Sequence, residues 1–249
     1  MNKLILAAVA VAALTAGAHA ATFKVGTEGG YPPYNFTNDA GKLAGYDIDV
    51  SNELCKRAGL DCVFVTNDWD TIIPNLLAGN YDGIVDDMSI TDERKQTIDF
   101  TEPYFPPDPS RFVSKAGKTF DYDHLKGFKI GAQNSTIQAG YLDDKLKADN
   151  TILKYDTQDQ EIADLNAGNI DLMFIDGSVA QETVAGSSGA LQTTGPDISI
   201  GEGAGIGLRK SDTELKGKLN AALEAIKKDG TLDGLIKKYF PNRPTPYWK

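Results

Sequence analysis

The stretch Leu77-Ala78-Gly79-Asn80-Tyr81-Asp82 returns later in the chain as Asn166-Ala167-Gly168-Asn169-Ile170-Asp171. In each copy a helix-type pattern stops at Ala-Gly-Asn and an apolar, strand-type run follows. A second aspartate, Asp87 in the first copy and Asp176 in the other, closes each run five residues later. The chain is therefore expected to contain two copies of one helix-to-strand unit.

A second pair of similar segments precedes these copies. Phe23-Lys24-Val25-Gly26 matches Phe128-Lys129-Ile130-Gly131, so the similarity extends over two halves of the chain and is not limited to one pair of short motifs. We therefore expect two related lobes, with Asp87 and Asp176 at equivalent strand ends. Two such ends that face each other would define a cleft.

Strand and helix patterns alternate around the repeats. The strands are expected at 23–27, 61–66, from 83, from 129 and at 171–175. The helices are expected at 47–58, about 70–78, about 160–167, about 212–228 and 232–239. Such a βαβα order predicts an α/β fold whose parallel strands are joined by right-handed crossovers.

Residues that break regular structure mark the edges of the second lobe. Pro103, Pro106, Pro107 and Pro109 crowd one edge, and the glycines of 201–207 crowd the other. Two crossings at these edges would make the first lobe discontinuous, a layout typical of a hinge. The expected boundaries are 21–107 with 204–249 for the first lobe and 108–203 for the second.

Residues 1–20 have the three-part layout of a secretory signal peptide. Lys3 is followed by an apolar run from Leu4 to about Ala16 and by Ala18-His19-Ala20, so cleavage is expected after Ala20. The run is shorter than the ~20 apolar residues that a membrane span needs. No cysteine lies near Ala20, so a lipid anchor is not expected. We expect an exported, soluble protein.

The acidic balance of the chain limits the classes of partner. The 249 residues carry a formal net charge of −10, which argues against nucleic acid or an anionic membrane and favours cationic ligands. Solubility alone would also explain this charge.

Only two cysteines, Cys55 and Cys62, are present. In an oxidising compartment we expect a disulfide that closes a small loop and stabilises the fold by about 2 kcal/mol. A metal pair or a thiol nucleophile has no support, because His124 is the one histidine after the signal peptide and no second ligand or base lies near it in sequence. Neither a metal nor a cofactor is expected.

Several motifs resemble those of the family 3 solute-binding proteins, the periplasmic polar amino-acid receptors of ABC importers. The motifs are Gly45-Tyr46-Asp47-Ile48-Asp49-Val50, Ser89-Ile90-Thr91-Asp92-Glu93-Arg94, Ile98-Asp99-Phe100-Thr101-Glu102-Pro103-Tyr104, Gly207-Leu208-Arg209-Lys210, Asp229-Gly230-Thr231 and Lys238-Tyr239-Phe240. The similarity covers almost the whole chain after the signal peptide. Cys55 and Cys62 also fall where the members that bind histidine, or lysine, arginine and ornithine, carry a disulfide.

The resemblance implies two α/β lobes joined by two strands, the type II arrangement of periplasmic binding proteins, which close on a ligand held between them. A monomer that delivers its ligand to membrane permease subunits and has no catalytic residues is implied. The implied ligand contacts are Glu28, Tyr31, Asp47, Trp69, Asp86, Asp87, Met88, Ser89, Arg94, Thr136, Ile137 and Asp176.

Each end of an amino acid has its own implied partners. Arg94 matches the carboxylate clamp, since a guanidinium offers two parallel donors to two oxygens. Ser89 matches the residue that holds the carboxylate through its backbone N–H and the ammonium through its hydroxyl. Thr136 and Ile137 match the amides that the second lobe contributes to the carboxylate. Asp176 matches the ammonium acceptor.

Tyr31 and Trp69 match the aromatic pair that sandwiches the ligand's side chain. Packing within a Tyr-Pro-Pro-Tyr corner would also explain Tyr31. Aromatic faces over a desolvated cation contribute about 1 to 2 kcal/mol, which suits a basic side chain.

The acidic residues bear on specificity. Glu28 and Asp47 match positions where receptors for basic amino acids place carboxylates, although Asp47 could instead cap its own helix. Asp86 and Asp87 replace a serine pair before Met88-Ser89. Like charges 4 Å apart repel by ~4 kcal/mol at an effective dielectric of about 20, so a cationic ligand is favoured. Arginine, ornithine or lysine is expected ahead of histidine.

Other readings remain open. Asp87 near Arg94 could neutralise the arginine, and the ligand would then be agmatine, another guanidino compound or an opine. Ser135 where a glycine is usual, and Ile137 where a second threonine is usual, are further departures. An exported dehydratase on the same fold would need a positioned acid or base, and no cleft-facing histidine, lysine or free cysteine is expected. A receptor that feeds a membrane kinase is the remaining alternative.

Overall fold

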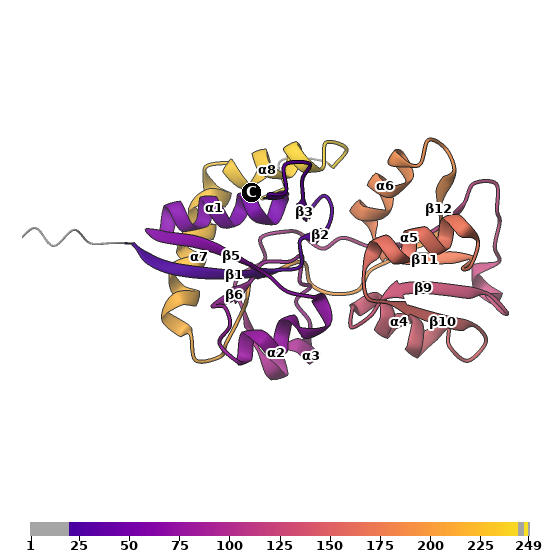
Figure 1. Ribbon diagram of the computed structural model, residues 1–249, viewed down its shortest axis with the longest axis horizontal. Helices are drawn as coiled ribbons and strands as arrows, with labels where there is room; N and C mark the ends of the chain where they lie inside the picture. Colours follow the sequence, from indigo (N-terminus) through magenta and orange to yellow (C-terminus); the bar gives the residue numbers. More distant parts are fainter. Residues whose placement is uncertain (1–19, 244–246, 249) are drawn as a thin grey trace, which may run out of the picture.

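Two α/β lobes lie side by side in the computed structural model, which describes residues 20–243, 247 and 248 (Figure 1). Apart from Ala20, the predicted signal peptide lies outside the described residues. Each lobe has a five-stranded sheet of its own. Within the described part of the chain, no helix is long and apolar enough to cross a bilayer.

The sheet of the first lobe combines residues from both ends of the described chain. Its strand order is β5 (Leu60–Thr66), β1 (Ala21–Thr27), β6 (Gly83–Ile84), β13 (Gly207–Leu208) and β7 (Asp99–Phe100). The helices of this lobe are α1 (Tyr46–Ala58), η1 (Trp69–Thr71), α2 (Ile72–Leu77), α3 (Asp92–Thr97), α7 (Thr213–Lys228) and α8 (Thr231–Tyr239). Helices α1 and α8 lie on one side of the sheet and α2 and α3 on the other, so both of its faces are covered (Figure 1).

The sheet of the second lobe is continuous in sequence. Its order is β10 (Thr151–Tyr155), β9 (Lys129–Gln133), β11 (Leu172–Asp176), β8 (Ser110–Lys115) and β12 (Leu191–Ile198). Its helices are η2 (Tyr122–His124), α4 (Ile137–Lys145), α5 (Gln158–Ala167) and α6 (Gly177–Gly186). A separate small sheet of β2 (Gly30–Tyr31), β3 (Asn35–Thr37) and β4 (Leu43–Ala44) belongs to the first lobe.

The two main sheets share one plan. Strands β5, β1 and β6 are parallel in the first lobe, as β10, β9 and β11 are in the second, and an antiparallel strand follows in each. That fourth strand, β13 or β8, enters each sheet just after the chain has crossed from the other lobe. The crossings lie in 101–109 and 199–206, where Phe105 bridges Ala204. The boundaries predicted at 107/108 and 203/204 fall within them.

The repeated Ala-Gly-Asn has the same conformation in both lobes. Gly79 and Gly168 have φ of 82° and 80°, left-handed values that suit glycine at a helix end. The backbone N–H of Asn80 donates to the Asn75 carbonyl, as that of Asn169 does to Asp164. Both helices therefore end in the same way.

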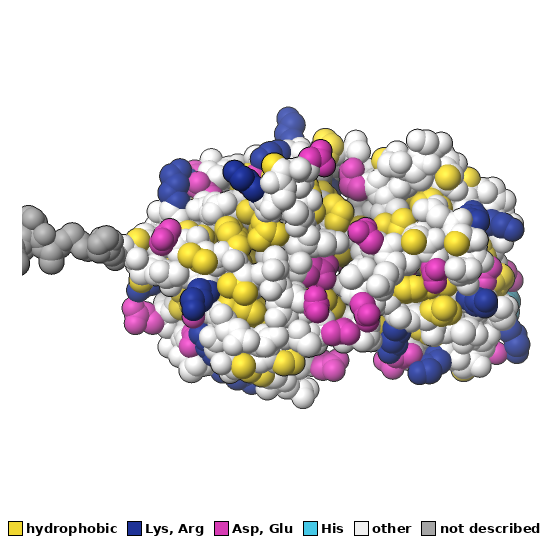
Figure 2. All heavy atoms as spheres, in the orientation of Figure 1, with side chains coloured by type: hydrophobic (Ala, Val, Ile, Leu, Met, Phe, Trp, Pro, Cys, Tyr) yellow, Lys and Arg dark blue, Asp and Glu magenta, His cyan; other side chains and the backbone are white. Residues whose placement is uncertain are grey.

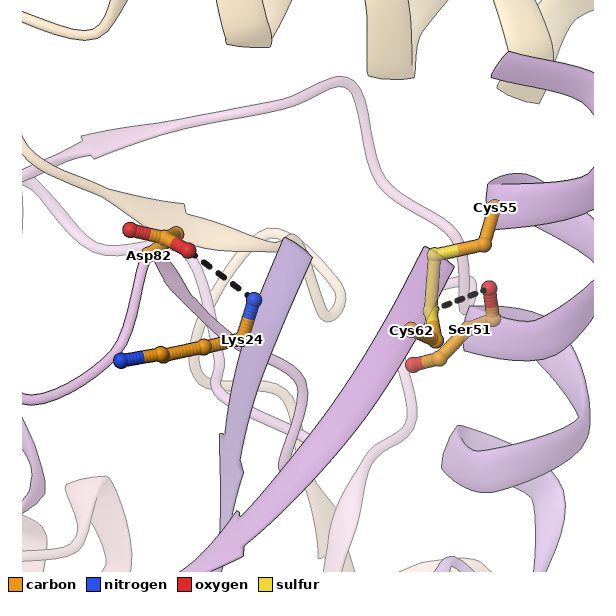
Figure 3. Close-up of a disulfide and its surroundings, with 5 residues drawn as sticks. All are labelled: Lys24, Ser51, Cys55, Cys62 and Asp82. Carbon is orange, nitrogen blue, oxygen red and sulfur yellow. Dashed lines mark hydrogen bonds between the residues drawn. A yellow bond between two sulfur atoms is a disulfide. The ribbon is translucent and has the colours of Figure 1, made fainter. Parts of the chain in front are cut away.

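The preceding pair of similar segments is explained by a second shared contact. The Lys24 backbone N–H donates to an Asp82 carboxylate oxygen at 2.9 Å (Figure 3), and the Lys129 N–H donates to Asp171 at the same distance. These carboxylates fix the start of β6 and β11 beside β1 and β9. The predicted duplication is thus a duplication of structure.

Helix α1 and its disulfide cover the first sheet. The helix starts after Gly45, whose φ is 122°; a Cβ there would lie 2.2 Å from the Tyr34 carbonyl oxygen, so glycine is required. The predicted disulfide joins Cys55 to Cys62 across a Cα–Cα distance of 5.9 Å, linking α1 to β5 (Figure 3). The cross-link fastens the helix to the edge strand of its own lobe.

Some elements differ from the sequence-based expectation. A helix, α3, occupies residues Asp92–Thr97, where no helix was expected, and Thr91 caps it by accepting from the Arg94 backbone N–H. The glycine-rich run expected only to break the pattern contains β13, which lies between β6 and β7 in the first sheet. Helix α6 follows β11 directly, although the pattern did not predict it.

Candidate functional site

A cleft between the lobes collects residues from strand ends. In the first lobe they follow β1 and β6, and in the second they end or follow β9 and β11. Carboxyl ends of parallel strands are the usual place for ligand sites in α/β sheets. The lining residues are Glu28, Tyr31, Trp69, Asp86, Asp87, Ser89, Arg94, Gln133, Thr136, Ile137, Gln138 and Asp176. Figure 2 shows acidic side chains gathered along the lobe boundary on the face in view.

Glu28 and Asp86 form one part of the first lobe's wall. Asp86 accepts hydrogen bonds at Oδ1 from the Thr27 hydroxyl and the Glu28 backbone N–H, both at 3.0 Å. Burial, and then repulsion from Glu28, raises the pKa of Asp86 well above its ordinary range. Burial also raises the pKa of Glu28 to about 7, although a hydrogen bond from Gln133 opposes the rise.

Asp87 has an unusual backbone conformation. Its φ of 44° is left-handed, which aspartate tolerates better than most residues. Its N–H donates to Asp47 Oδ2 at 3.1 Å and to the Tyr104 hydroxyl at 3.0 Å, which holds this conformation. Burial, and then repulsion from Asp176, raises the pKa of the Asp87 carboxyl well above its ordinary range.

Asp47 and Met88 lie behind the cleft lining rather than on it. Asp47 is fully buried and accepts from Asn35 Nδ2 and the Tyr104 hydroxyl as well as from the Asp87 amide. Burial raises its pKa to about 6. It does not cap α1 either, because the capping position belongs to Gly45. Asp47 thus positions the Asp87 turn, and Met88 packs in the core under the sheet.

Arg94 reaches from α3 toward the second lobe. Its guanidinium donates to the Ser89 carbonyl at 2.9 Å and to the Ser135 carbonyl at 3.3 Å. Burial lowers its pKa to about 10, and attraction to Asp176 opposes this effect. The side chain therefore stays cationic and is the one cation among the described lining residues.

Aromatic residues flank the charged groups. The Arg94 guanidinium carbon lies 5.3 Å from the centre of the Trp69 ring, within the range of a cation–π contact. Tyr31 stacks on Tyr34 with ring centroids 6.0 Å apart and also faces the cleft. Tyr31 therefore combines the packing role and the lining role that the sequence left as alternatives.

The second lobe's wall is built around the N-terminus of α4. Thr136 caps the helix by accepting from the Ala139 backbone N–H, so its hydroxyl serves the helix itself. The first N–H groups of a helix lack intrahelical partners and carry the positive end of its dipole. With Thr136 and Ile137 on the lining, this end suits a carboxylate.

Asp176 is held by donors from both lobes. Its Oδ2 accepts from the Tyr31 hydroxyl at 2.6 Å, and its Oδ1 accepts from Gln138 Nε2 at 2.8 Å. Burial raises its pKa to about 6, and the Tyr31 hydrogen bond opposes the rise. The carboxylate is thus fixed in place at the end of β11.

Gln133 and Gln138 belong to the site and were not predicted from the sequence. Gln133 is the last residue of β9, so the strand-end argument applied to the aspartates would have found it. Gln138 lies in the first turn of α4. In the sequence it cannot be distinguished from an ordinary solvent-facing glutamine at the start of a helix.

Hydrogen bonds across the cleft close the lobes on each other. Gln133 donates to Glu28 at 2.9 Å, and Tyr31 donates to Asp176. At the rim, Asn134 Nδ2 donates to Asp70 at 2.9 Å. The described residues contain no group of three histidine, cysteine or acidic side chains placed to hold a metal ion.

Two duplicated α/β lobes, two crossings and a polar cleft between them define a two-lobed binding protein of the periplasmic type. The comparisons agree. The family model of the bacterial extracellular solute-binding proteins, family 3, matches residues 23–242. This chain belongs to that family.

Relatives with assigned ligands are similar over almost the whole length. The lysine/arginine/ornithine-binding periplasmic protein of Escherichia coli is 35% identical, with 96% of this chain and 97% of the relative covered. The L-arginine-binding protein of Pseudomonas aeruginosa shows the same identity and coverage. A periplasmic His/Glu/Gln/Arg/opine family-binding protein from Silicibacter pomeroyi, solved in complex with lysine, is 48% identical. Its TM-score is 0.83, with 91% of this chain and 100% of that chain covered.

Proposed function

We propose that this protein is a periplasmic receptor for a cationic amino acid that it delivers to the permease subunits of an ABC importer. Arginine, ornithine and lysine are preferred to histidine. The observation that carries the proposal is the charge of the cleft, where Arg94 stands alone among the carboxylates of Glu28, Asp86, Asp87 and Asp176. The relatives named for lysine and arginine support it.

We assign each end of the ligand to residues of the cleft lining. The ligand carboxylate lies between Arg94 and the N-terminus of α4, and its ammonium meets Asp176. Ser89, whose carbonyl accepts from Arg94, is on the same lining. The distal cation points toward Glu28 and Asp86, beside Tyr31 and Trp69. Each charge removed from water thereby acquires a partner of opposite sign.

Closure follows from the position of these groups on both lobes. A ligand that contacts Arg94 and Asp176 together stabilises the closed arrangement, so binding shifts an existing equilibrium between open and closed lobes. The closed form is the one that the permease recognises in this proposal. Export with loss of residues 1–20 places the receptor in the periplasm, and the receptor acts as a monomer.

A second candidate ligand class is an amine without a free carboxylate, such as agmatine, or an opine. The specific observation in its favour is Asp87, whose charge lies close enough to Arg94 to oppose the fall in the Arg94 pKa. An internal partner of this kind lowers the need for a ligand carboxylate.

Catalysis is not part of the proposed function. The cleft lining, as far as the structure describes the chain, includes no histidine, lysine or cysteine. Glu28 has a pKa of about 7 and can therefore exchange protons near neutral pH, a property that the sequence did not indicate. We assign it to ligand binding, as in transport proteins. Turnover of prephenate or arogenate by the purified protein would contradict this assignment.

A thermal-shift panel tests the proposal. The twenty amino acids, agmatine, octopine and putrescine are each added to the protein, and arginine, lysine and ornithine are expected to raise the melting temperature most. A larger shift with agmatine or octopine would select the second candidate. The absence of a shift with every cationic compound would overturn the ligand class.

A further inference from the structure

The carboxylate of Asp86 has one oxygen without a partner. The residue is 3% exposed, and its Oδ1 receives both hydrogen bonds, from Thr27 and the Glu28 backbone. Its Oδ2 is buried and has no hydrogen-bond donor. Asp86 also lines the cleft beside Glu28. A buried, unpaired carboxylate oxygen is costly and calls for a proton or an external cation.

The neighbouring charges with the largest effect on Glu28 and Asp86 are negative. They are Asp47 on α1, Asp68 before η1 and Asp159 on α5 for Glu28, and Glu28 and Asp47 for Asp86. Asp86 in turn raises the pKa values of its titratable neighbours Tyr81 and Asp87 around β6. No ion pair in the described part of the chain includes Glu28 or Asp86. Arg94, the cation of the lining, is instead attracted to Asp176, Glu93 and Asp87.

We propose that Glu28 and Asp86 share one proton before the ligand binds, and that the distal cation of the ligand displaces this proton into solvent. One positive charge enters the subsite as one leaves, so the net charge of the subsite is the same before and after binding. The inference deepens the proposed function and rests on it, because it requires a cationic ligand.

The geometry explains why the exchange occurs at this pair. Two neighbouring carboxylates that cannot both be ionised without repulsion titrate as a unit. Burial raises the pKa of Glu28 to about 7, so proton binding and release fall near neutral pH. Gln133 donates to one Glu28 oxygen from the second lobe and therefore brings the pair under the same closure as the ligand.

Proton exchange makes affinity and specificity depend on pH. A ligand that displaces one proton binds up to about tenfold more tightly for each unit that the pH rises, over the range where the pair is protonated. Citrulline has the shape of arginine but a neutral distal group, so the proton stays on the pair when citrulline binds. Both ligands meet Asp176 with the same ammonium, so its titration affects both alike. The difference between the ligands therefore isolates Glu28 and Asp86.

Calorimetry in two buffers counts the protons. Arginine and citrulline are titrated at pH 6.5 in phosphate and in ACES, both of which buffer at this pH and whose heats of ionisation differ, and the protons released are obtained from the difference in heat. For the full chain without its signal peptide, arginine is expected to release about one proton more than citrulline. Asp86→Asn is expected to abolish this difference. Asp68→Asn, which removes an exposed carboxylate near the same group, is the matched control and should preserve it.

The outcomes separate the two proposals. If arginine binds and releases no more protons than citrulline, the shared proton is contradicted and the receptor function stands. If no cationic ligand binds, both are overturned. A ligand-independent readout accompanies the titration: the infrared band of a protonated carboxyl group at pH 6.5 should weaken in Asp86→Asn, and an unchanged band in a folded variant would also contradict the inference.

Discussion

Strand β6 in the first lobe and β11 in the second lie at equivalent places, each parallel to a neighbour and each followed by an aspartate that lines the cleft. After β11 the chain enters α6 at once, and Asp176 occupies the helix's capping position. After β6 the next helix, α3, begins only at Asp92, and in between Asp87 turns through a left-handed conformation. Tyr31 and Gln138 donate to the Asp176 carboxylate, whereas no described residue donates to that of Asp87. Duplication has conserved the position of the two carboxylates, but their local backbones give them different chemistry.

The two walls of the cleft, one from each lobe, also differ in the residues that they present. The first lobe presents Glu28, Asp86 and Asp87, with Asp47 buried behind them. The second presents the N-terminus of α4, two glutamines and one carboxylate. The first wall thus selects positive charge, and the second holds a carboxylate and an ammonium. Arg94 is the exception, a cation from the first lobe that reaches the second.

Removal of Arg94 should produce the largest effect. Arg94→Ala leaves the ligand carboxylate without its charged partner, which costs about 2–5 kcal/mol and weakens arginine binding at least about 30-fold. Agmatine, which has no carboxylate, should lose little affinity. Lys95→Ala is the matched control, because Lys95 is exposed and pairs with Glu202 at the surface. Arginine affinity that stays within about tenfold in Arg94→Ala, measured by calorimetry, would contradict the carboxylate clamp.

The acidic wall should lower stability as pH rises. Asp47 has a folded-state pKa of about 6, against 3.8 in the unfolded chain, so the folded state binds more protons between these values. Unfolding free energy therefore falls with rising pH, and the loss from Asp47 alone is on the order of 3 kcal/mol and complete above about pH 6. Urea unfolding of the ligand-free protein at pH 5.0 and 7.5 measures the upper part of this loss, about 1.4 kcal/mol from Asp47. Greater stability at pH 7.5 would contradict the assigned burial of these carboxylates.

Replacing each of the two strand-end aspartates by asparagine tests the comparison between the lobes. Asp176→Asn should weaken arginine binding by about 10- to 30-fold, since it removes the charged acceptor of the ammonium. Asp87→Asn should change it by less than about fivefold and should raise stability, because it removes an unpaired charge. A larger loss in Asp87→Asn would reverse the roles and favour the amine ligands. Affinities and urea midpoints of both variants decide between these outcomes.

The disulfide gives the smallest effect and is confined to one lobe. Replacing Cys55 and Cys62 by serine should lower the unfolding free energy by about 2 kcal/mol. Arginine affinity should change by less than about twofold, since the bond joins α1 to β5 and neither cysteine lines the cleft. Denaturant unfolding and calorimetry of the double variant test both statements. A marked loss of affinity would show that the cross-link supports the site as well as the fold.

The duplicated lobes were predictable because their signals are local. The glycines at 79 and 168 end helices in both lobes, and the Lys24–Asp82 and Lys129–Asp171 contacts follow from the two pairs of matching segments. Strand β13 was not predictable, since two residues, Gly207 and Leu208, carry no periodic pattern. Its place in the sheet depends on the chain's return from the second lobe.

The sequence predicted most of the residues at the site, but not which of them line the cleft and which are buried behind the lining. Most of the expected contacts line the cleft, because the motifs place them at strand ends and helix starts. Asp47 was misplaced for a tertiary reason: its partners Asn35 and Tyr104 come from distant segments that turn it away from the cleft. The raised pKa of Glu28 depends on burial, which no sequence pattern reports.

The central claim is that the cleft selects a second positive charge on an amino acid. Equilibrium dialysis with arginine and citrulline at pH 7.5 tests it most directly, because the two ligands differ in the distal group alone. Citrulline would leave the buried carboxylates of the first lobe without a charged partner, so arginine is expected to bind at least about 100-fold more tightly. Equal affinities for arginine and citrulline would contradict the account.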